Sequence, residues 1–205
     1  MSRRILVLVA GLALLCGCSP SYSPAYSNHV TAGPESDRPI AFTGAGFDME
    51  AAANVSRATT DATWAGVLAT LNRYLDAGVL TPLFSGGPAG DLTPLFTSPA
   101  VDRVDKGPDR AAFIDENLPP TTDVHADAVV ANLTALAGTD GTVSVVSATL
   151  DLRLTGRANG VPVTVRRTGD VVLLPDSGTW KIDAYDISAT RTLGDAPATT
   201  TTAHA

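Results

Sequence analysis

VSATLDLRL, residues Val146–Leu154, is the stretch that indicates the fold most directly, because apolar and polar residues alternate along it. Alternation with period two places one set of side chains on each face of a strand, so a half-buried strand is expected there. Similar runs lie at 124–136, 161–174 and 180–191, and the alternation of the last one slips near Ala184–Tyr185, where a bulge is expected. Consecutive strands joined by short polar turns predict an antiparallel sheet.

The part of the chain before these strands has a helical pattern. Residues 48–77 contain one Gly and no Pro, and their apolar side chains recur at helical spacing. A long helix is therefore expected, with Asp48 as its N-cap. The motif LTPLF occurs at 80–84 and again at 92–96, and each Thr-Pro suits a first helical turn whose Leu and Phe enter the core. A further short helix is expected at 108–116.

The first residues have the pattern of a secretory signal peptide. Two arginines precede an apolar run of eleven residues, ILVLVAGLALL at 5–15. A membrane-spanning helix needs roughly 20 such residues, so the run fits the core of a signal peptide instead. The following LCGC at 15–18 resembles the lipobox of bacterial lipoproteins, with Gly17 and Leu15 at the positions that the signal peptidase reads before Cys18. This resemblance implies cleavage after residue 17 and attachment of diacylglycerol to Cys18.

The chain is therefore expected to divide into four parts. These are a signal peptide (1–17), a lipidated flexible tether rich in Ser, Pro and Tyr (18–41), one domain (42–193) and a disordered tail (194–205). Both cysteines lie within the lipobox, so the domain is expected to have neither a disulfide nor a thiolate metal site. The sequence GAG at 44–46 lacks the third Gly of a dinucleotide-binding turn, and no cofactor or metal site is expected.

The composition limits both the core and the partners. Hydrophobic residues make up 44% of the 205 residues and aromatic residues only 5%, so a core of Ala, Val, Leu and Ile is expected. The formal net charge is −7, and no basic cluster is present in the sequence. Such a chain is not expected to bind nucleic acid. The lipobox resemblance instead implies a membrane as the partner, because the acyl anchor would hold the protein on the extracytoplasmic face of that membrane.

Helices followed by strands in series predict an α+β domain. The order and lengths of the elements, with the ending DSGTWKI at 176–182, resemble the NTF2-like (SnoaL-like) cone, in which a long first helix crosses a curved antiparallel sheet. The whole chain is also similar to envelope lipoproteins of GC-rich Gram-positive bacteria. The fold resemblance implies a homodimer as one possible assembly, formed through the outer face of the sheet, but it does not decide the function.

The resemblance also implies where catalysis would lie, because NTF2-like enzymes place a His or Asp base inside the cone. The only histidine of the predicted domain is His125, close to Asp127, and Asp186 is a further candidate. Three aspartates and three arginines occupy the strands and can share one face, either inside a site or on a solvated outer surface. They are Asp151, Asp170, Asp186, Arg153, Arg166 and Arg167. Since alternating charges commonly line an outer sheet face, the solvated surface is the favoured interpretation.

Several aromatic side chains are candidates for lining a ligand cavity, although their spacings suit a plain core equally. They are Trp64, Tyr74, Phe96 and Phe113. The leading hypothesis is a membrane-anchored envelope lipoprotein whose domain is a non-enzymatic binding or accessory module for a small apolar ligand or an envelope protein. One alternative is a SnoaL-like enzyme with a His or Asp general base. The other is a purely structural module whose cone is filled by its own side chains.

The lipobox hypothesis gives a direct prediction. Cys18→Ala removes the thiol that carries the acyl anchor, so the protein is expected to move from the membrane fraction to the soluble fraction. Fractionation of cells followed by immunoblotting measures this. If the variant stays in the membrane fraction as completely as the parent chain, Cys18 is not the anchor.

Overall fold

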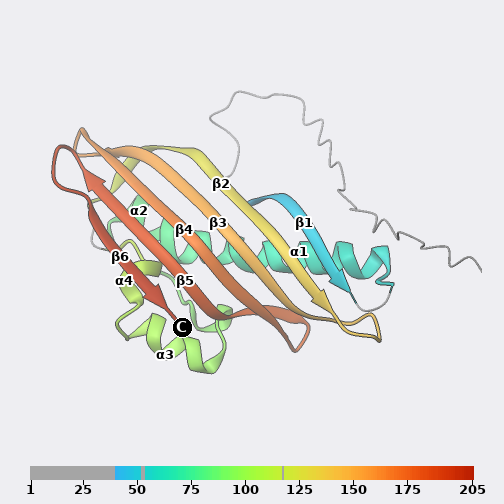
Figure 1. Ribbon diagram of the computed structural model, residues 1–205. Helices are drawn as coiled ribbons and strands as arrows, with labels where there is room; N and C mark the ends of the chain where they lie inside the picture. Colours follow the sequence, from blue (N-terminus) through green and yellow to red (C-terminus); the bar gives the residue numbers. More distant parts are fainter. Residues whose placement is uncertain (1–39, 52–53, 117) are drawn as a thin grey trace, which may run out of the picture.

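The protein is an α+β structure in which the helices cover one face of a six-stranded sheet (Figure 1). The computed structural model describes residues 40–51, 54–116 and 118–205. The expected signal peptide, Cys18 and nearly all of the expected tether lie outside these residues. No helix in the described part is long and apolar enough to cross a bilayer.

The sheet has its strands in the order of the chain, from β1 to β6. β1 is parallel to β2, and every other neighbouring pair is antiparallel. Asn159-Gly160 and Ser177-Gly178 form the two tightest turns, and all four residues have positive φ, as type I′ hairpin turns require. The strands span Thr43–Ala51 (β1), Thr121–Ala137 (β2), Val143–Ala158 (β3), Val161–Asp176 (β4), Thr179–Leu193 (β5) and Thr199–His204 (β6).

The slip in alternation on the last predicted strand is a β-bulge, as expected. The register runs from Val172 opposite Ala184 to Leu173 opposite Ile182, which leaves Asp183 as the extra residue on β5. The bulge is joined to the helical layer, because Thr97 donates a hydrogen bond from its hydroxyl to Asp183 Oδ1 at 2.8 Å. The backbone of Thr97 also donates to the carbonyl of Ile182.

The expectation of a helix from Asp48 is wrong at its beginning. Residues Thr43–Ala51 form β1, and Phe47 on this strand is buried opposite Leu133 of β2. Pairing with β2 supplies backbone hydrogen bonds that local helical spacing cannot anticipate. α1 begins at Arg57, and its N-cap is Ser56, whose hydroxyl accepts a hydrogen bond from the Thr59 amide at 3.1 Å.

The helical layer is one long helical run followed by short pieces. α1 (Arg57–Tyr74) continues as a π-helical stretch (Leu75–Leu80) and then as α2 (Thr81–Ser85). After a loop come a 3₁₀ turn (Thr93–Leu95), α3 (Ser98–Asp105) and α4 (Arg110–Phe113).

Both LTPLF motifs begin helical turns, with Pro in the first turn as expected. The burial of their apolar side chains differs from the prediction at one position. Leu83, Leu95 and Phe96 are buried, whereas Phe84 is 51% exposed and does not enter the core. The two copies therefore pack differently, because the first belongs to an α-helix and the second to a single 3₁₀ turn.

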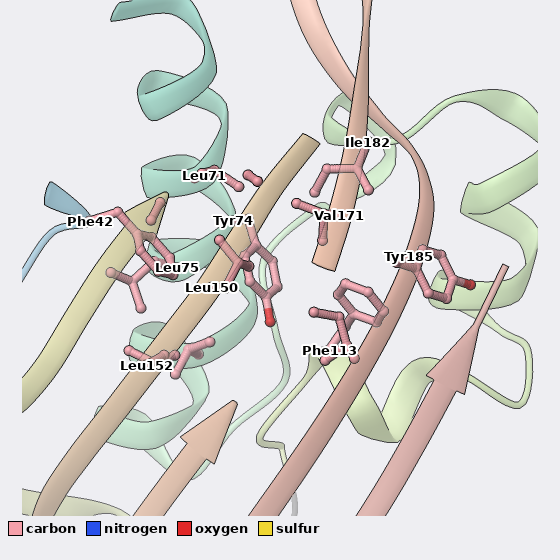
Figure 2. Packing of buried hydrophobic residues seen from close by; sticks show 14 of the residues in the cluster. Phe42, Leu71, Tyr74, Leu75, Phe113, Leu150, Leu152, Val171, Ile182 and Tyr185 are labelled. Atoms are coloured by element: carbon pink, nitrogen blue, oxygen red, sulfur yellow. The ribbon is translucent and has the colours of Figure 1, made fainter. Parts of the chain in front are cut away.

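The interior between helices and sheet contains a cluster of aromatic rings around Phe113 (Figure 2). The ring of Phe113 lies edge-to-face against Tyr74, Phe96 and Tyr185, with centroid separations of 5.6, 5.4 and 4.7 Å. These side chains come from α1, the residue after the 3₁₀ turn, α4 and β5. The cluster therefore joins α1, α4 and the end of the 3₁₀ turn to the sheet.

The tail is not disordered as expected, because Thr199–His204 form β6 on the edge of β5. Four consecutive threonines favour extended backbone, since branching at Cβ suits a pleated surface. Ala203 is buried against the helical layer, while its neighbours Thr202 and His204 are exposed on the other face. The domain therefore continues beyond residue 193.

Two glycines with positive φ give a prediction for the sheet. Gly169 on β4 has φ 137°, and a Cβ atom there would lie 2.0 Å from the carbonyl oxygen of Asp186. Gly160 has φ 81° in a turn, and a Cβ atom there would meet nothing within 4 Å. We expect Gly169→Ala to lower the free energy of unfolding by about 3 kcal/mol and Gly160→Ala by about 1 kcal/mol. Urea denaturation measures both, and equal losses would contradict this register of β4 and β5.

Candidate functional site

The structure does not bring the three catalytic candidates together. His125 and Asp127 are exposed on the first half of β2, where His125 lies opposite Thr155 of β3. Asp186 lies on β5, with β3 and β4 between it and β2. Its side chain is 68% exposed and forms an ion pair with Nδ1 of His204 at 2.8 Å. None of the three side chains is enclosed, so they do not form an interior acid–base site.

The four aromatic candidates fall into two separate places. Tyr74, Phe96 and Phe113 are buried in the aromatic cluster of the core, and Figure 2 shows Tyr74 and Phe113 there. Trp64 lies elsewhere, on α1, with its ring edge-to-face to Phe47 of β1 at 5.5 Å. The first three side chains fill interior space around Phe113 rather than lining either of the two clefts described below.

The charged side chains of the central strands lie on two faces. Five of them lie on the face opposite the helices, exposed or half-buried, and these are Asp151, Asp170, Asp186, Arg153 and Arg166. Arg167 does not belong with them, because it points into the helical side of the sheet and is only 1% exposed. The sequence contained a signal for this placement, since Val163, Val165 and Arg167 share one face of an alternating strand.

Arg167 belongs to a buried triad, in which Asp115 lies between two arginines. Asp115 Oδ2 is 2.6 Å from Arg167 Nη1, and Asp115 Oδ1 contacts Arg191 Nε. Asp115 and Arg167 are each 1% exposed. Arg167 projects from β4 and Arg191 from β5, whereas Asp115 follows α4. This ion pair therefore joins the sheet to the helical layer.

Backbone carbonyls hold both guanidinium groups in place. Arg167 Nε donates to the carbonyl of Ala112 at 2.9 Å. Arg191 Nη2 donates to the carbonyls of Ala111 and Ile114, at 2.6 and 2.9 Å. These carbonyls belong to α4 and to the residue after it, where unpaired acceptors and the helix dipole favour a cation.

The triad has an excess of positive charge, because one carboxylate faces two guanidinium groups. Burial, the largest single effect, lowers the pKa of the Arg167 guanidinium, but the charge of Asp115, the interaction with Tyr74 and the hydrogen bond to Asp115 together outweigh it, and the net shift of this pKa is upward. Two further buried groups, Arg167 Nη2 and the Tyr74 hydroxyl, have no hydrogen-bond partner among the described residues. Burial raises the pKa of Tyr74, so this hydroxyl stays neutral and does not offset the charge.

The neighbouring ion pairs are balanced. Arg103 Nε donates to Asp109 Oδ2 at 2.7 Å, and the Tyr185 hydroxyl donates to the same oxygen at 2.7 Å. Burial, followed by the hydrogen bond to Asp109, raises the pKa of Tyr185 to about 12. Arg110 binds Glu116 through two nitrogens, at 2.8 and 2.7 Å. The neighbouring arginines therefore do not take Asp115 as a partner, and the extra positive charge belongs to the triad.

A cleft opens beside the triad, between α4, the end of β5, the connection to β6 and β6 itself. We call it the Arg191 cleft, and its volume is about 260 Å³. Among the described residues that line it, Arg191 is the only charged side chain. The lining residues are Ala111, Ile114, Leu118, Arg191, Thr192, Leu193, Ala196, Pro197, Thr199 and Thr201.

A second, more open groove of about 530 Å³ lies between the first half of α1 and the β4–β5 turn, against Trp180. The described residues that line it carry no charge. The two depressions therefore differ in chemistry, because only the Arg191 cleft combines an apolar lining with an ionised group. No group of three or more His, Cys, Asp or Glu side chains in the described ranges is placed to hold a metal ion.

Comparisons with protein-family models, with curated proteins and with solved structures find no match for this chain. The arrangement of the Arg191 cleft is suited to binding. Arg191 offers N–H donors and a positive charge, so it can orient and neutralise an anion.

The buried triad gives a prediction for stability. Asp115→Asn keeps the size of the side chain but removes the negative charge between the buried guanidinium group of Arg167 and the half-buried one of Arg191. We expect the free energy of unfolding to fall by about 3–5 kcal/mol, because an uncompensated buried charge is strongly destabilising. Asp186→Asn removes a carboxylate from an exposed ion pair on the outer face and is the matched control, with little expected effect. Urea denaturation of both variants measures the difference, and similar small losses would contradict the triad.

Proposed function

We propose that this protein is a lipid-anchored lipoprotein of the cell envelope and that its domain is a non-enzymatic binding module for a small apolar ligand. In this proposal Cys18 carries the lipid on the extracytoplasmic face of the cell membrane. The ligand occupies the Arg191 cleft. The observation that supports this site is a concave, largely apolar lining with one fixed charged group, which is the usual character of small-ligand sites.

The size of the cleft limits the ligand. The cleft has a volume of about 260 Å³ and is open on one side, so it can hold a head group and several carbon atoms of a chain whose end extends into solvent. Six side chains supply the apolar contact, and they are Ala111, Ile114, Leu118, Leu193, Ala196 and Pro197. This size favours a short aliphatic chain over a polycyclic molecule.

We also infer that the fold is of the NTF2-like type. Support comes from the long α1 packed across the sheet and from the antiparallel series β2 to β5 that follows the helices. The parallel strand β1, which precedes α1, is an addition to the predicted pattern. In this inference the helices occupy the concave side of the cone, and the ligand binds at its margin beside α4 rather than at its centre.

Docking of an envelope protein is a second candidate, favoured by one observation. Val161 and Leu193 are 39% and 36% exposed at the same end of the sheet, and Leu193 also lines the Arg191 cleft. A Cβ atom on Gly194 would lie 2.7 Å from Val161 Cγ1, which shows how closely the two strand ends approach. A partner that covered this end would close the cleft.

Filling the cleft tests the proposed function. Membranes that contain the full chain are exposed to a photoactivatable octanol, and the labelled peptides are identified by mass spectrometry. We expect labelling within residues 111–118 and 190–201, and we expect Thr201→Trp to reduce it about tenfold by occupying the cleft. Thr200→Trp is the control, because Thr200 lies on the same strand but on the opposite face, against Thr190.

Labelling of the cleft that Thr201→Trp leaves unchanged would contradict the site. Absence of labelling in the parent chain, together with an envelope protein cross-linked at Val161 or Leu193, would favour the second candidate instead.

A further inference from the structure

We propose that the ligand of the Arg191 cleft is a monocarboxylate with a short apolar chain, whose carboxylate pairs with Nη1 of Arg191. This inference rests on the proposed function and assigns the chemical class of its ligand. It is supported by the hydrogen bonds of Arg191, by the charge of the triad and by the lining of the cleft.

Among the described residues, the hydrogen-bond partners of Arg191 contact only Nε and Nη2 of its guanidinium group. An arginine has five N–H donors in a planar fork. In Arg191 the Nε donor is used by Asp115, and Nη2 donates to the carbonyls of Ala111 and Ile114. No described residue accepts a hydrogen bond from Nη1. The side chain lines the cleft and is 13% exposed, so a ligand in the cleft has access to a group whose orientation is already fixed.

The charge of the triad favours a ligand with one negative charge. Arg167 and Arg191 share the single carboxylate of Asp115, and the nearby pairs Arg103–Asp109 and Arg110–Glu116 leave no free carboxylate for them. A bound carboxylate would therefore complete an alternating series of arginine, aspartate, arginine and ligand. A neutral ligand leaves the excess charge uncompensated, and a dianion reverses it.

The rest of the cleft fits the remainder of such a molecule. The hydroxyl groups of Thr199 and Thr201 line the cleft and can donate to the second carboxylate oxygen. The apolar side chains of the cleft then remain for the aliphatic chain. A charge-assisted pair in a partly buried site is worth more than a neutral hydrogen bond, so the carboxylate is expected to decide the preference among ligands of equal length.

The experiment compares two probes that differ only in the head group. A photoactivatable octanoate and the corresponding octanol are added near neutral pH to membranes that contain the full chain, and labelling of residues 111–118 and 190–201 is measured for each. We expect octanoate to label the cleft about tenfold more efficiently than octanol, as one charge-assisted hydrogen-bond pair implies. In competition, unlabelled octanoate is expected to displace the probe better than octanol or octyl phosphate.

Thr201→Asp provides the decisive variant. It places a carboxylate in the cleft, where it takes the position of the ligand's charge beside Arg191, so the tenfold preference for octanoate over octanol is expected to disappear. Thr200→Asp adds the same charge to the outer face of β6 and is expected to keep the preference. The ratio of the two probes is the readout, because it is insensitive to a general loss of binding.

The outcomes separate this inference from the proposed function. Equal labelling of the cleft by both probes in the parent chain would overturn the carboxylate inference and leave the binding module in place. Stronger competition by octyl phosphate would likewise overturn it. If neither probe labels the cleft, the proposed function itself fails. If Thr201→Asp does not fold, the competition between octanoate, octanol and octyl phosphate in the parent chain still tests whether the cleft prefers a carboxylate.

Discussion

The pairing of Asp115 with two arginines is the interaction on which the arrangement of helices and sheet depends. Arg167 and Arg191 reach from neighbouring strands to the segment that follows α4, and the Asp115 amide donates to the carbonyl of Gly78 in the π-helical stretch at 3.1 Å. Removing these charges from water has a large free-energy cost, so the ion pairs and carbonyl contacts must all form together. The triad therefore specifies how the short helices sit on the sheet, while the aromatic cluster around Phe113 supplies apolar contact.

The same interaction gives the cleft its chemistry. Arg191 belongs both to the triad and to the wall of the cleft, so a structural ion pair fixes the orientation of the group that faces a ligand. A guanidinium held by three hydrogen bonds through Nε and Nη2 loses little conformational entropy when it binds an anion, and such preorganisation strengthens binding. In the proposed function, recognition of the ligand thus depends on an ion pair that also stabilises the fold. Changes to the triad are expected to alter stability and binding together.

Strong alternation in the sequence predicted the strands from Val143 to Leu193, because each has one buried and one exposed face. Local patterns failed where pairing with another strand decides the structure. Residues 43–51 became a strand through pairing with β2, and residues 199–204 through pairing with β5. The site was missed for a related reason. Arg167 was grouped with outward charges although its neighbours Val163 and Val165 mark an inward face. Asp115 was expected inside a short helix at 108–116, but α4 ends at Phe113 and Asp115 follows it.

The most direct test of this account is an NMR study of the arginine side chains in the full chain. The account predicts that the Nε–H groups of Arg167 and Arg191 are protected from exchange with water, and that addition of octanoate shifts the guanidinium signals of Arg191 while those of Arg166, on the outer face, stay unchanged. Rapid exchange of Arg167 and Arg191, at the rate of Arg166, would show that the triad does not hold the helical layer to the sheet. That result would contradict the central claim.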